Sequence, residues 1–277
     1  MDYVVPVDLA AAVEMRGAGY LVLAGGTDLY PQHVGRPMSQ PVLDIGALEE
    51  LRGIEETPDG HRIGALTRWT DVVAASLPTR FDGLRAAARE VGSVQVQNAG
   101  TVGGNLCNAS PAADGIPPLL SLDASVELTS AARRRVLPLE AFLTGYRQTA
   151  LRSDELLTAV LIPHGPDGAR SAFLKLGLRR YLVISVVMVA VVVVFEPDRR
   201  IALARAAVGA CSPVAQRLRS LESALTGRSL DELDPAMVVE HLVELSPIDD
   251  VRATADYRRS AAALLVWRAL DRCGVDA

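Results

Sequence analysis

A run of small and polar residues from Gly92 to Pro118 most constrains how this chain of 277 residues can fold. The run is rich in Gly, Asn, Ser and Pro, has little helical periodicity and contains one acidic side chain, Asp114. Connections longer than about 15 residues inside a compact domain are uncommon, and they are generally either functional or disordered. We interpret the run as a loop that builds a ligand site, because its composition is unlike that of a disordered tail.

Paired glycines suggest which ligand this is. Thr101–Asn105 (TVGGN) places two glycines beside a hydroxyl and an amide, and Ala24–Leu29 (AGGTDL) has the same character. Glycine lets backbone N–H groups approach and surround an anion, such as the diphosphate of a dinucleotide. Asp114 is a candidate acceptor for a ribose or ribityl hydroxyl. The two segments together predict a dinucleotide site.

The two common nucleotide motifs are absent from the sequence. No GxxxxGK[ST] pattern occurs, which excludes a P-loop. A Rossmann fingerprint would need GxGxxG after the first strand, whereas Gly17-Ala18-Gly19 precedes that strand and lacks the third glycine.

Hydrophobic patterning indicates an α+β protein without regular βαβ alternation. Pro58-Asp59-Gly60 reads as a turn between paired strands, and Asp8 as the cap of the first helix. The expected strands are 20–24, 42–45, 61–66, 125–129, 135–137, 156–162, 172–176, 183–195 and 202–209. The expected helices are 9–16, one capped by Thr70 or Asp71, 81–91, and a helical region from Pro213 to the end.

Composition limits the kind of partner. The net charge of −5 argues against nucleic acid, which demands a basic face. The most hydrophobic stretch, Leu182–Phe195, falls short of the roughly 20 residues that a membrane span needs and reads as a buried strand. The start, Met1-Asp2-Tyr3, lacks the layout of a signal peptide, so we expect a cytoplasmic protein.

Three widely spaced cysteines, Cys107, Cys211 and Cys273, cannot build a disulfide framework and contain no CxxC pair. We therefore expect no metal site in this chain, and any iron–sulfur cluster that it serves must lie on another chain. Cys107 falls inside the glycine-rich run, where we expect a small buried hydrophobic residue.

The glycine segments resemble a known family. AGGTDL and Thr101–Asp114 (TVGGNLCNASPAAD) are similar to the two flavin-binding signatures of the FAD-binding medium subunit of molybdenum hydroxylases, the carbon monoxide dehydrogenase and xanthine dehydrogenase family. The resemblance continues through Leu156–Ile162 (LLTAVLI), Ser171–Val187 (SAFLKLGLRRYLVISVV) and Val251–Arg259 (VRATADYRR), and so covers nearly the whole chain. The longer second signature is highly specific, whereas AGGTDL alone is weak.

The resemblance implies a fold and a domain order. The fold would be α+β, with a two-subdomain FAD-binding fold of the vanillyl-alcohol-oxidase (PCMH) type followed by a C-terminal domain of a small antiparallel sheet plus helices. The implied boundaries are 1–60 for the first FAD-binding subdomain, 61–168 for the second and 169–277 for the C-terminal domain.

The resemblance also implies a set of FAD contacts. Both glycine segments would line the diphosphate, and Asp114 would hold the cofactor by its hydroxyls. Leu156 or Leu157 would pack near the isoalloxazine ring, and we take Leu157 as the contact. Lys175, the one lysine among 28 basic residues, matches a position beside the flavin. The predicted contacts are Val22, Leu23, Ala24, Gly25, Gly26, Thr27, Asp28, Leu29, Thr101, Val102, Gly103, Gly104, Asn105, Asp114, Leu157 and Lys175.

The implied function is electron transfer within a hetero-oligomer. A large partner would carry molybdopterin, a small partner would carry [2Fe–2S] clusters, and non-covalent FAD on this chain would pass electrons to an external acceptor. No residue of this chain would then act as a substrate acid or base. Two alternatives stay open: a stand-alone flavin oxidase or reductase of the same fold, for which Cys107 offers a point of covalent attachment, and an assembly subunit that has lost its cofactor.

Overall fold

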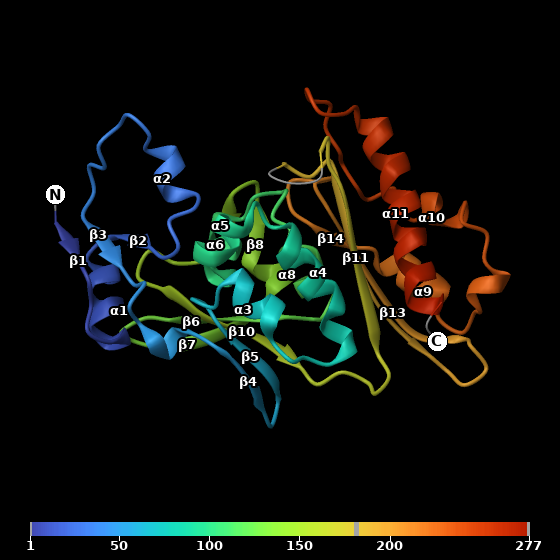
Figure 1. Ribbon diagram of the computed structural model, residues 1–277, viewed down its shortest axis with the longest axis horizontal. Coiled ribbons are helices and arrows are strands. Elements are labelled where there is room, and N and C mark those ends of the chain that lie inside the picture. Colours follow the sequence, from blue (N-terminus) through green and yellow to red (C-terminus); the bar gives the residue numbers. More distant parts are fainter. Residues whose placement is uncertain (1, 180–182, 276–277) are drawn as a thin grey trace.

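The computed structural model describes residues 2–179 and 183–275, which form three β-sheets and a small hairpin with helices packed around them (Figure 1). The predicted α+β class is confirmed. Leu182, where we expected the hydrophobic run to begin, lies outside the described residues. None of the helices in the described part of the chain is both long enough and apolar enough to cross a bilayer.

The first sheet is parallel, with the strand order β1-β3-β2. The Asp8 carboxylate accepts a hydrogen bond from the Ala11 amide at 2.8 Å and caps α1, as predicted. The apolar face of this helix packs on Leu43 and Ile45 of the sheet. The elements here are β1 (Tyr3–Val4), α1 (Leu9–Gly17), β2 (Leu21–Leu23), α2 (Leu29–Gln32) and β3 (Val42–Asp44).

The second sheet is antiparallel, with the order β4-β5-β10-β6-β7. The predicted turn at Gly60 joins β4 to β5, and a Cβ on this glycine would lie 2.0 Å from the Ile162 carbonyl oxygen of the neighbouring strand. Only glycine fits this approach. The strands are β4 (Ile54–Thr57), β5 (Gly60–Gly64), β6 (Ser125–Thr129), β7 (Arg134–Pro138) and β10 (Leu156–Pro163). The flanking elements are α3 (Trp69–Ala74), α4 (Asp82–Glu90), α8 (Leu139–Phe142) and the hairpin of β8 (Leu143–Gly145) and β9 (Gln148–Thr149).

The Gly92–Pro118 run is not the extended loop that we predicted. It forms α5 (Val94–Ala99), α6 (Val102–Asn108) and the start of α7 (Ile116–Ser121). The first two are set by their caps, because Ser93 Oγ accepts from the Val96 amide and Thr101 Oγ1 accepts from the Gly104 amide. Helices of six or seven residues are too short to show a period, so the sequence pattern missed them.

The cap of α3 also differs from the expectation. Arg68, rather than Thr70 or Asp71, is the N-cap residue. Asp71 lies at the third helical position, where its carboxylate accepts a hydrogen bond from the Arg68 amide at 2.9 Å. This is the reciprocal half of a capping box, and it satisfies one of the amides at the start of the helix.

The third sheet is antiparallel and lies between two layers of helices (Figure 1). In strand β12, Val187, Val189, Val191 and Val193 face the C-terminal helices, and the alternate residues face helices α4 and α7. Burial on both faces explains the unbroken hydrophobic run. The elements are β11 (Arg170–Leu176), β12 (Val187–Phe195), β13 (Ile201–Gly209), β14 (Gln216–Arg217), α9 (Arg219–Leu225), α10 (Met237–Glu240) and α11 (Ala255–Val275). Short strand β14 precedes the C-terminal helices that we expected from Pro213.

A buried histidine lies where the second sheet leads into the third. The ring of His61 in β5 is 7% exposed and packs on Phe81, and its Nδ1 lies 3.1 Å from Arg80 Nη2. Arg80 also donates to the Pro163 carbonyl at 2.7 Å. Burial, followed by the charge of Arg80, lowers the pKa of His61 below its ordinary value of 6.5, although Glu56 opposes the shift.

This histidine should make stability depend on pH. Because the folded-state pKa is lowered, the unfolded chain binds more protons near pH 6, so stability is full above pH 6.5 and falls as the pH drops toward the folded-state pKa. One such group adds a slope of at most about 1.4 kcal/mol per pH unit. Urea unfolding at pH 7.5 and 5.5 should show the loss for wild type and a smaller loss for His61→Gln. An equal loss in both proteins would contradict the assignment.

Candidate functional site

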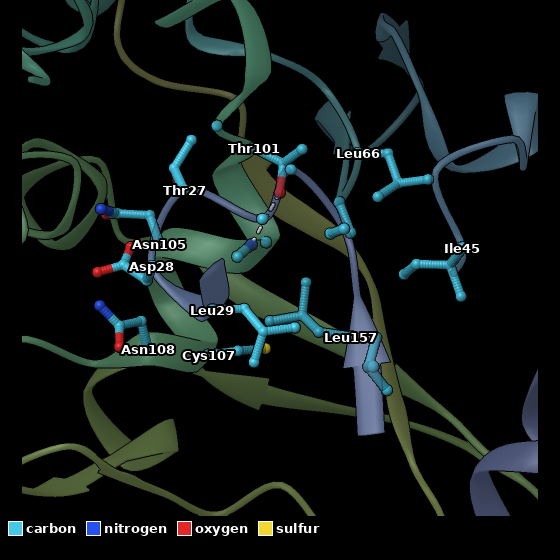
Figure 2. A pocket seen from close by; sticks show the side chains of 18 of the residues that line it. Thr27, Asp28, Leu29, Ile45, Leu66, Thr101, Asn105, Cys107, Asn108 and Leu157 are labelled. Atoms are coloured by element: carbon cyan, nitrogen blue, oxygen red, sulfur yellow. Dashed lines mark hydrogen bonds between the residues drawn. The ribbon is translucent and has the colours of Figure 1, made fainter. Parts of the chain in front are cut away.

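A cavity of about 400 Å³ lies between the first sheet, β10 and α6. Its two sides differ in character: the polar side chains of Asp28, Asn105 and Asn108 line one side, and Ile45 and Leu66 line the other (Figure 2). A pocket of this size with an apolar wall and a few polar groups is typical of a small-molecule or cofactor site.

The first glycine segment forms one wall of this cavity, directly after β2. A Cβ on Gly25 would lie 2.0 Å from the carbonyl oxygen of Ala99, so the two glycine-bearing regions touch backbone to backbone. Gly26 has φ +69, and a Cβ there would lie 2.4 Å from the Tyr30 ring. Both positions therefore require glycine.

The amides of this segment are available to a ligand. The backbone N–H groups of Gly25, Gly26, Thr27 and Asp28 donate to no acceptor among the described residues. All four residues line the cavity, and the two glycines can contribute only backbone atoms to it. Successive unpaired amides at a turn form a concave site for an anion. The arrangement therefore fits a diphosphate.

The second glycine segment is already hydrogen-bonded. The Val102 amide donates to the Thr67 carbonyl and the Gly103 amide to the Ala65 carbonyl, at 2.9 and 2.8 Å. The Gly104 amide donates to Thr101 Oγ1 at 3.1 Å. We predicted that both segments surround the diphosphate with N–H groups. In the structure only the first segment has amides without an acceptor, so only the first can do so.

The second segment instead shapes the cavity. A Cβ on Gly103 would lie 2.8 Å from Ala65, so this glycine allows α6 to pack on β5. A Cβ on Gly104 would meet only Thr101 Oγ1, at 2.9 Å, and would otherwise stand in the cavity. Asn105 contributes a buried Oδ1 that has no hydrogen-bond partner, which is the kind of acceptor that a ligand hydroxyl satisfies.

Most of the predicted contacts meet at this cavity. Those that line it are Val22, Ala24, Gly25, Gly26, Thr27, Asp28, Leu29, Thr101, Gly103, Gly104, Asn105 and Leu157. Leu156 lines it as well, so both members of the leucine pair reach the wall. The side chains of Leu23 and Val102 point into the hydrophobic core, where they are 3% and 1% exposed.

Asp114 and Lys175 are placed together, beside this cavity rather than in its wall. Lys175 Nζ lies 2.6 Å from Asp114 Oδ2, and both side chains are almost fully buried. Ser185 Oγ donates to the other carboxylate oxygen at 2.7 Å, and Lys175 also donates to the Glu90 carbonyl. Burial raises the pKa of Asp114, and Lys175 and Ser185 oppose that shift. The pair joins β11 to the segment that precedes α7, and its contact with a cofactor stays a prediction.

Several cavity residues were missed by sequence reasoning. Ile45 follows β3, and the carboxyl ends of parallel neighbours β2 and β3 meet at one edge, which is a signal that could have found it. Arg16, Leu66 and Trp69 carried no such signal. Cys107 is exposed on the cavity wall, so our expectation of a buried residue was wrong; its side chain lies on the cavity-facing side of α6 (Figure 2).

Comparison with known proteins supports this interpretation. Residues 1–165 match the family model of the FAD binding domain in molybdopterin dehydrogenase, and residues 172–273 match the CO dehydrogenase flavoprotein C-terminal domain. The chain is 32% identical to the xanthine dehydrogenase FAD-binding subunit of Escherichia coli O157:H7, with 86% of this chain and 82% of that protein covered. It is 32% identical to caffeine dehydrogenase subunit beta of Pseudomonas sp. strain CBB1, with 98% and 94% covered.

A solved structure shows the same fold over the full length. Carbon monoxide dehydrogenase from Hydrogenophaga pseudoflava, in a form that lacks the Mo-pyranopterin moiety of its cofactor, superposes with a TM-score of 0.90. The identity is 28%, and 98% of this chain and 96% of that chain are covered. The first glycine segment with its unpaired amides, the full-length fold and the two family matches agree. The chain belongs to the FAD-binding flavoprotein subunits of the molybdopterin-containing dehydrogenases.

Proposed function

We propose that this chain transfers electrons through a non-covalent FAD within a three-part molybdenum hydroxylase. Electrons would arrive from iron–sulfur clusters on a small partner and leave to an external acceptor, and a large partner would hold molybdopterin. The observation that carries the proposal is the set of four unpaired amides from Gly25 to Asp28, which fit a diphosphate. When bound, FAD supplies a ring that accepts and releases one or two electrons.

The chain's own residues would bind and orient the cofactor. The amides of Gly25–Asp28 would hold the diphosphate, and Asn105 Oδ1 would accept a hydrogen bond from a hydroxyl. Asp114 can accept a further hydroxyl beside Lys175 and Ser185, because a carboxylate has about four acceptor sites. The Lys175 ammonium would then place positive charge toward the ring, which favours its reduced, anionic form.

The assembly and the domain limits are proposals as well. Relatives are named as medium chains or FAD-binding subunits of dehydrogenases, which supports a hetero-oligomer here. We propose domains at 1–60, 61–168 and 169–277. The first and third sheets fall within the first and last ranges, whereas β4 of the second sheet precedes residue 61. We also assign the complex to the cytoplasm, where thiols such as those of Cys107 and Cys211 stay reduced.

The visible spectrum of the purified chain tests the cofactor directly. We expect flavin absorption bands near about 370 and 450 nm, which belong to the ring itself. The bands should leave the protein fraction after denaturing precipitation, because we propose non-covalent binding. A protein that stays colourless after addition of FAD would refute the proposal. Flavin that remains in the precipitate would instead indicate covalent attachment and would favour Cys107 as its site.

The partners need a separate experiment. Affinity purification of the tagged chain from its native host should retain one larger and one smaller subunit, together with molybdenum and iron in the eluate. Retention of the flavin without any partner would favour the stand-alone oxidase or reductase. Adding a substrate-oxidising partner should bleach the flavin band only in the assembled complex.

A further inference from the structure

One end of the cavity carries a cation that the proposed function does not use. Arg16, near the end of α1, lines the cavity and is partly buried. Its Nη1 donates to the Tyr20 carbonyl at 2.9 Å and its Nε to the Glu155 carbonyl at 3.4 Å. The Glu155 carboxylate is engaged by Arg135, whose Nε and Nη2 each reach it at 2.7 Å. In the described part of the chain, Arg16 therefore has no carboxylate partner.

The position of Arg16 excludes direct contact with the diphosphate. Arg16 is fixed at Tyr20, which precedes β2, whereas the unpaired amides begin at Gly25, which follows it. A strand rises about 3.3 Å per residue, so β2 alone separates the two points by roughly 10 Å. The guanidinium consequently marks a different part of the ligand.

The surroundings of Arg16 suit a flat aromatic ring. The cavity wall beside Arg16 is apolar, because Leu21 and Leu156 line it and directly follow Tyr20 and Glu155, whose carbonyls hold the guanidinium. A guanidinium is planar, stacks on aromatic faces and donates several hydrogen bonds. Adenine suits both properties of the guanidinium, because the flat faces of its ring can stack and its ring nitrogens accept hydrogen bonds.

The other aromatic ring of FAD, the isoalloxazine, belongs near Lys175, away from Arg16. Asn105 lies on the polar side of the cavity, away from Ile45 and Leu66 (Figure 2). A Cβ on Gly115 would lie 3.0 Å from Asn105 Oδ1, and Gly115 directly follows Asp114, the partner of Lys175. The proposed flavin neighbour, Lys175 of β11, therefore adjoins Asn105, and Figure 1 shows β11 and α1, the helix that carries Arg16, on opposite sides of α5 and α6.

From this arrangement we infer that Arg16 recognises the adenine ring and makes the chain select FAD over ligands that lack adenine. The inference rests on the proposed function. It also places Leu156 and Leu157 beside the adenine, in place of the isoalloxazine position that the family resemblance assigned to them. Arg16 is thus a specificity residue for the cofactor.

Isothermal titration of the cofactor-free full chain with ADP and with inorganic pyrophosphate tests this. Both probes occupy the diphosphate site, and only ADP carries adenine. For Arg16→Ala we expect ADP and FAD to bind about 10- to 100-fold more weakly, as for loss of a charged hydrogen-bonding group, with pyrophosphate binding unchanged. Arg16→Lys keeps the positive charge but lacks the planar guanidinium, so its affinities for ADP and FAD should lie between those of Arg16→Ala and wild type.

A second arginine provides a matched control. Arg52 Nη1 donates to the Leu66 carbonyl at 3.1 Å and Nη2 to the Gly46 carbonyl at 2.6 Å, but Arg52 is not part of the cavity wall. Arg52→Ala should lower the melting temperature without changing the ratio of ADP to pyrophosphate affinity. If Arg16→Ala weakened the binding of ADP and pyrophosphate equally, or weakened neither, the inference would be overturned. The proposed function would still stand as long as wild type binds FAD. Failure of wild type to bind FAD would overturn both.

Discussion

Replacing Asp114 with asparagine should lower the free energy of unfolding by about 3 kcal/mol or more, the range measured when one partner of a buried ion pair is removed. The variant leaves the Lys175 ammonium, with 6% of its side chain exposed, without its carboxylate. The Glu90 carbonyl and the Ser185 hydroxyl cannot replace a full negative charge. Urea unfolding of the cofactor-free chain would measure the loss.

A double-mutant cycle separates the pairing from the packing. Lys175→Met should also destabilise, because it leaves the buried Asp114 charge unpaired, whereas Asp114→Asn with Lys175→Met removes both charges. We expect the double variant to be more stable than the sum of the single losses predicts. Lys175 is the only lysine, so amine-reactive labelling adds an independent measurement. Labelling at Lys175 should be slow in wild type and faster in Asp114→Asn; additive losses together with equal labelling rates would contradict the ion pair.

Replacing Gly104 with alanine should weaken FAD binding at least tenfold while leaving the fold stable. The added Cβ would stand in the cavity, where it would meet only Thr101 Oγ1. Alanine favours a helix over glycine by about 1 kcal/mol, which offsets damage to the Thr101 cap of similar size. Titration of cofactor-free protein with FAD would measure the affinity, and thermal unfolding would measure the stability.

Two other glycines are controls for Gly104. Gly103→Ala places its Cβ 2.8 Å from the Ala65 backbone oxygen, so it should destabilise the fold by about 1–3 kcal/mol, as overpacking does. Gly17→Ala adds a methyl group to open space at the end of α1 and should change neither property. Normal FAD affinity in Gly104→Ala would refute the assignment of this surface to the cofactor.

The sequence predicted which residues line the cavity more accurately than it predicted their local structure. Ten of the twelve predicted contacts that line the cavity lie in AGGTDL and TVGGN. Gly25 and Gly103 there are required by close backbone approach, and a steric requirement of this kind can be recognised from the residue type alone. The same reasoning took Gly92–Pro118 for a loop, because α5 and α6 are too short to have a period and are defined by the Ser93 and Thr101 caps. The Asp8 cap of α1, by contrast, could be predicted because an unbroken run of residues that favour a helix, LAAAVEMR, follows it and Gly17 comes next.

The sequence by itself determined the α+β class, the hairpin turn at Gly60 and the two glycine segments, because each depends on local sterics or on patterning along the chain. Only the tertiary structure decided which amides are free to bind a ligand. The amides of Val102 and Gly103 donate hydrogen bonds to the carbonyls of Thr67 and Ala65, which are distant in sequence. It also brought Arg16 to the cavity and Lys175 to Asp114. Hydrogen-bond partners and ion pairs between distant segments depend on how the sheets pack together, and no local pattern encodes that packing.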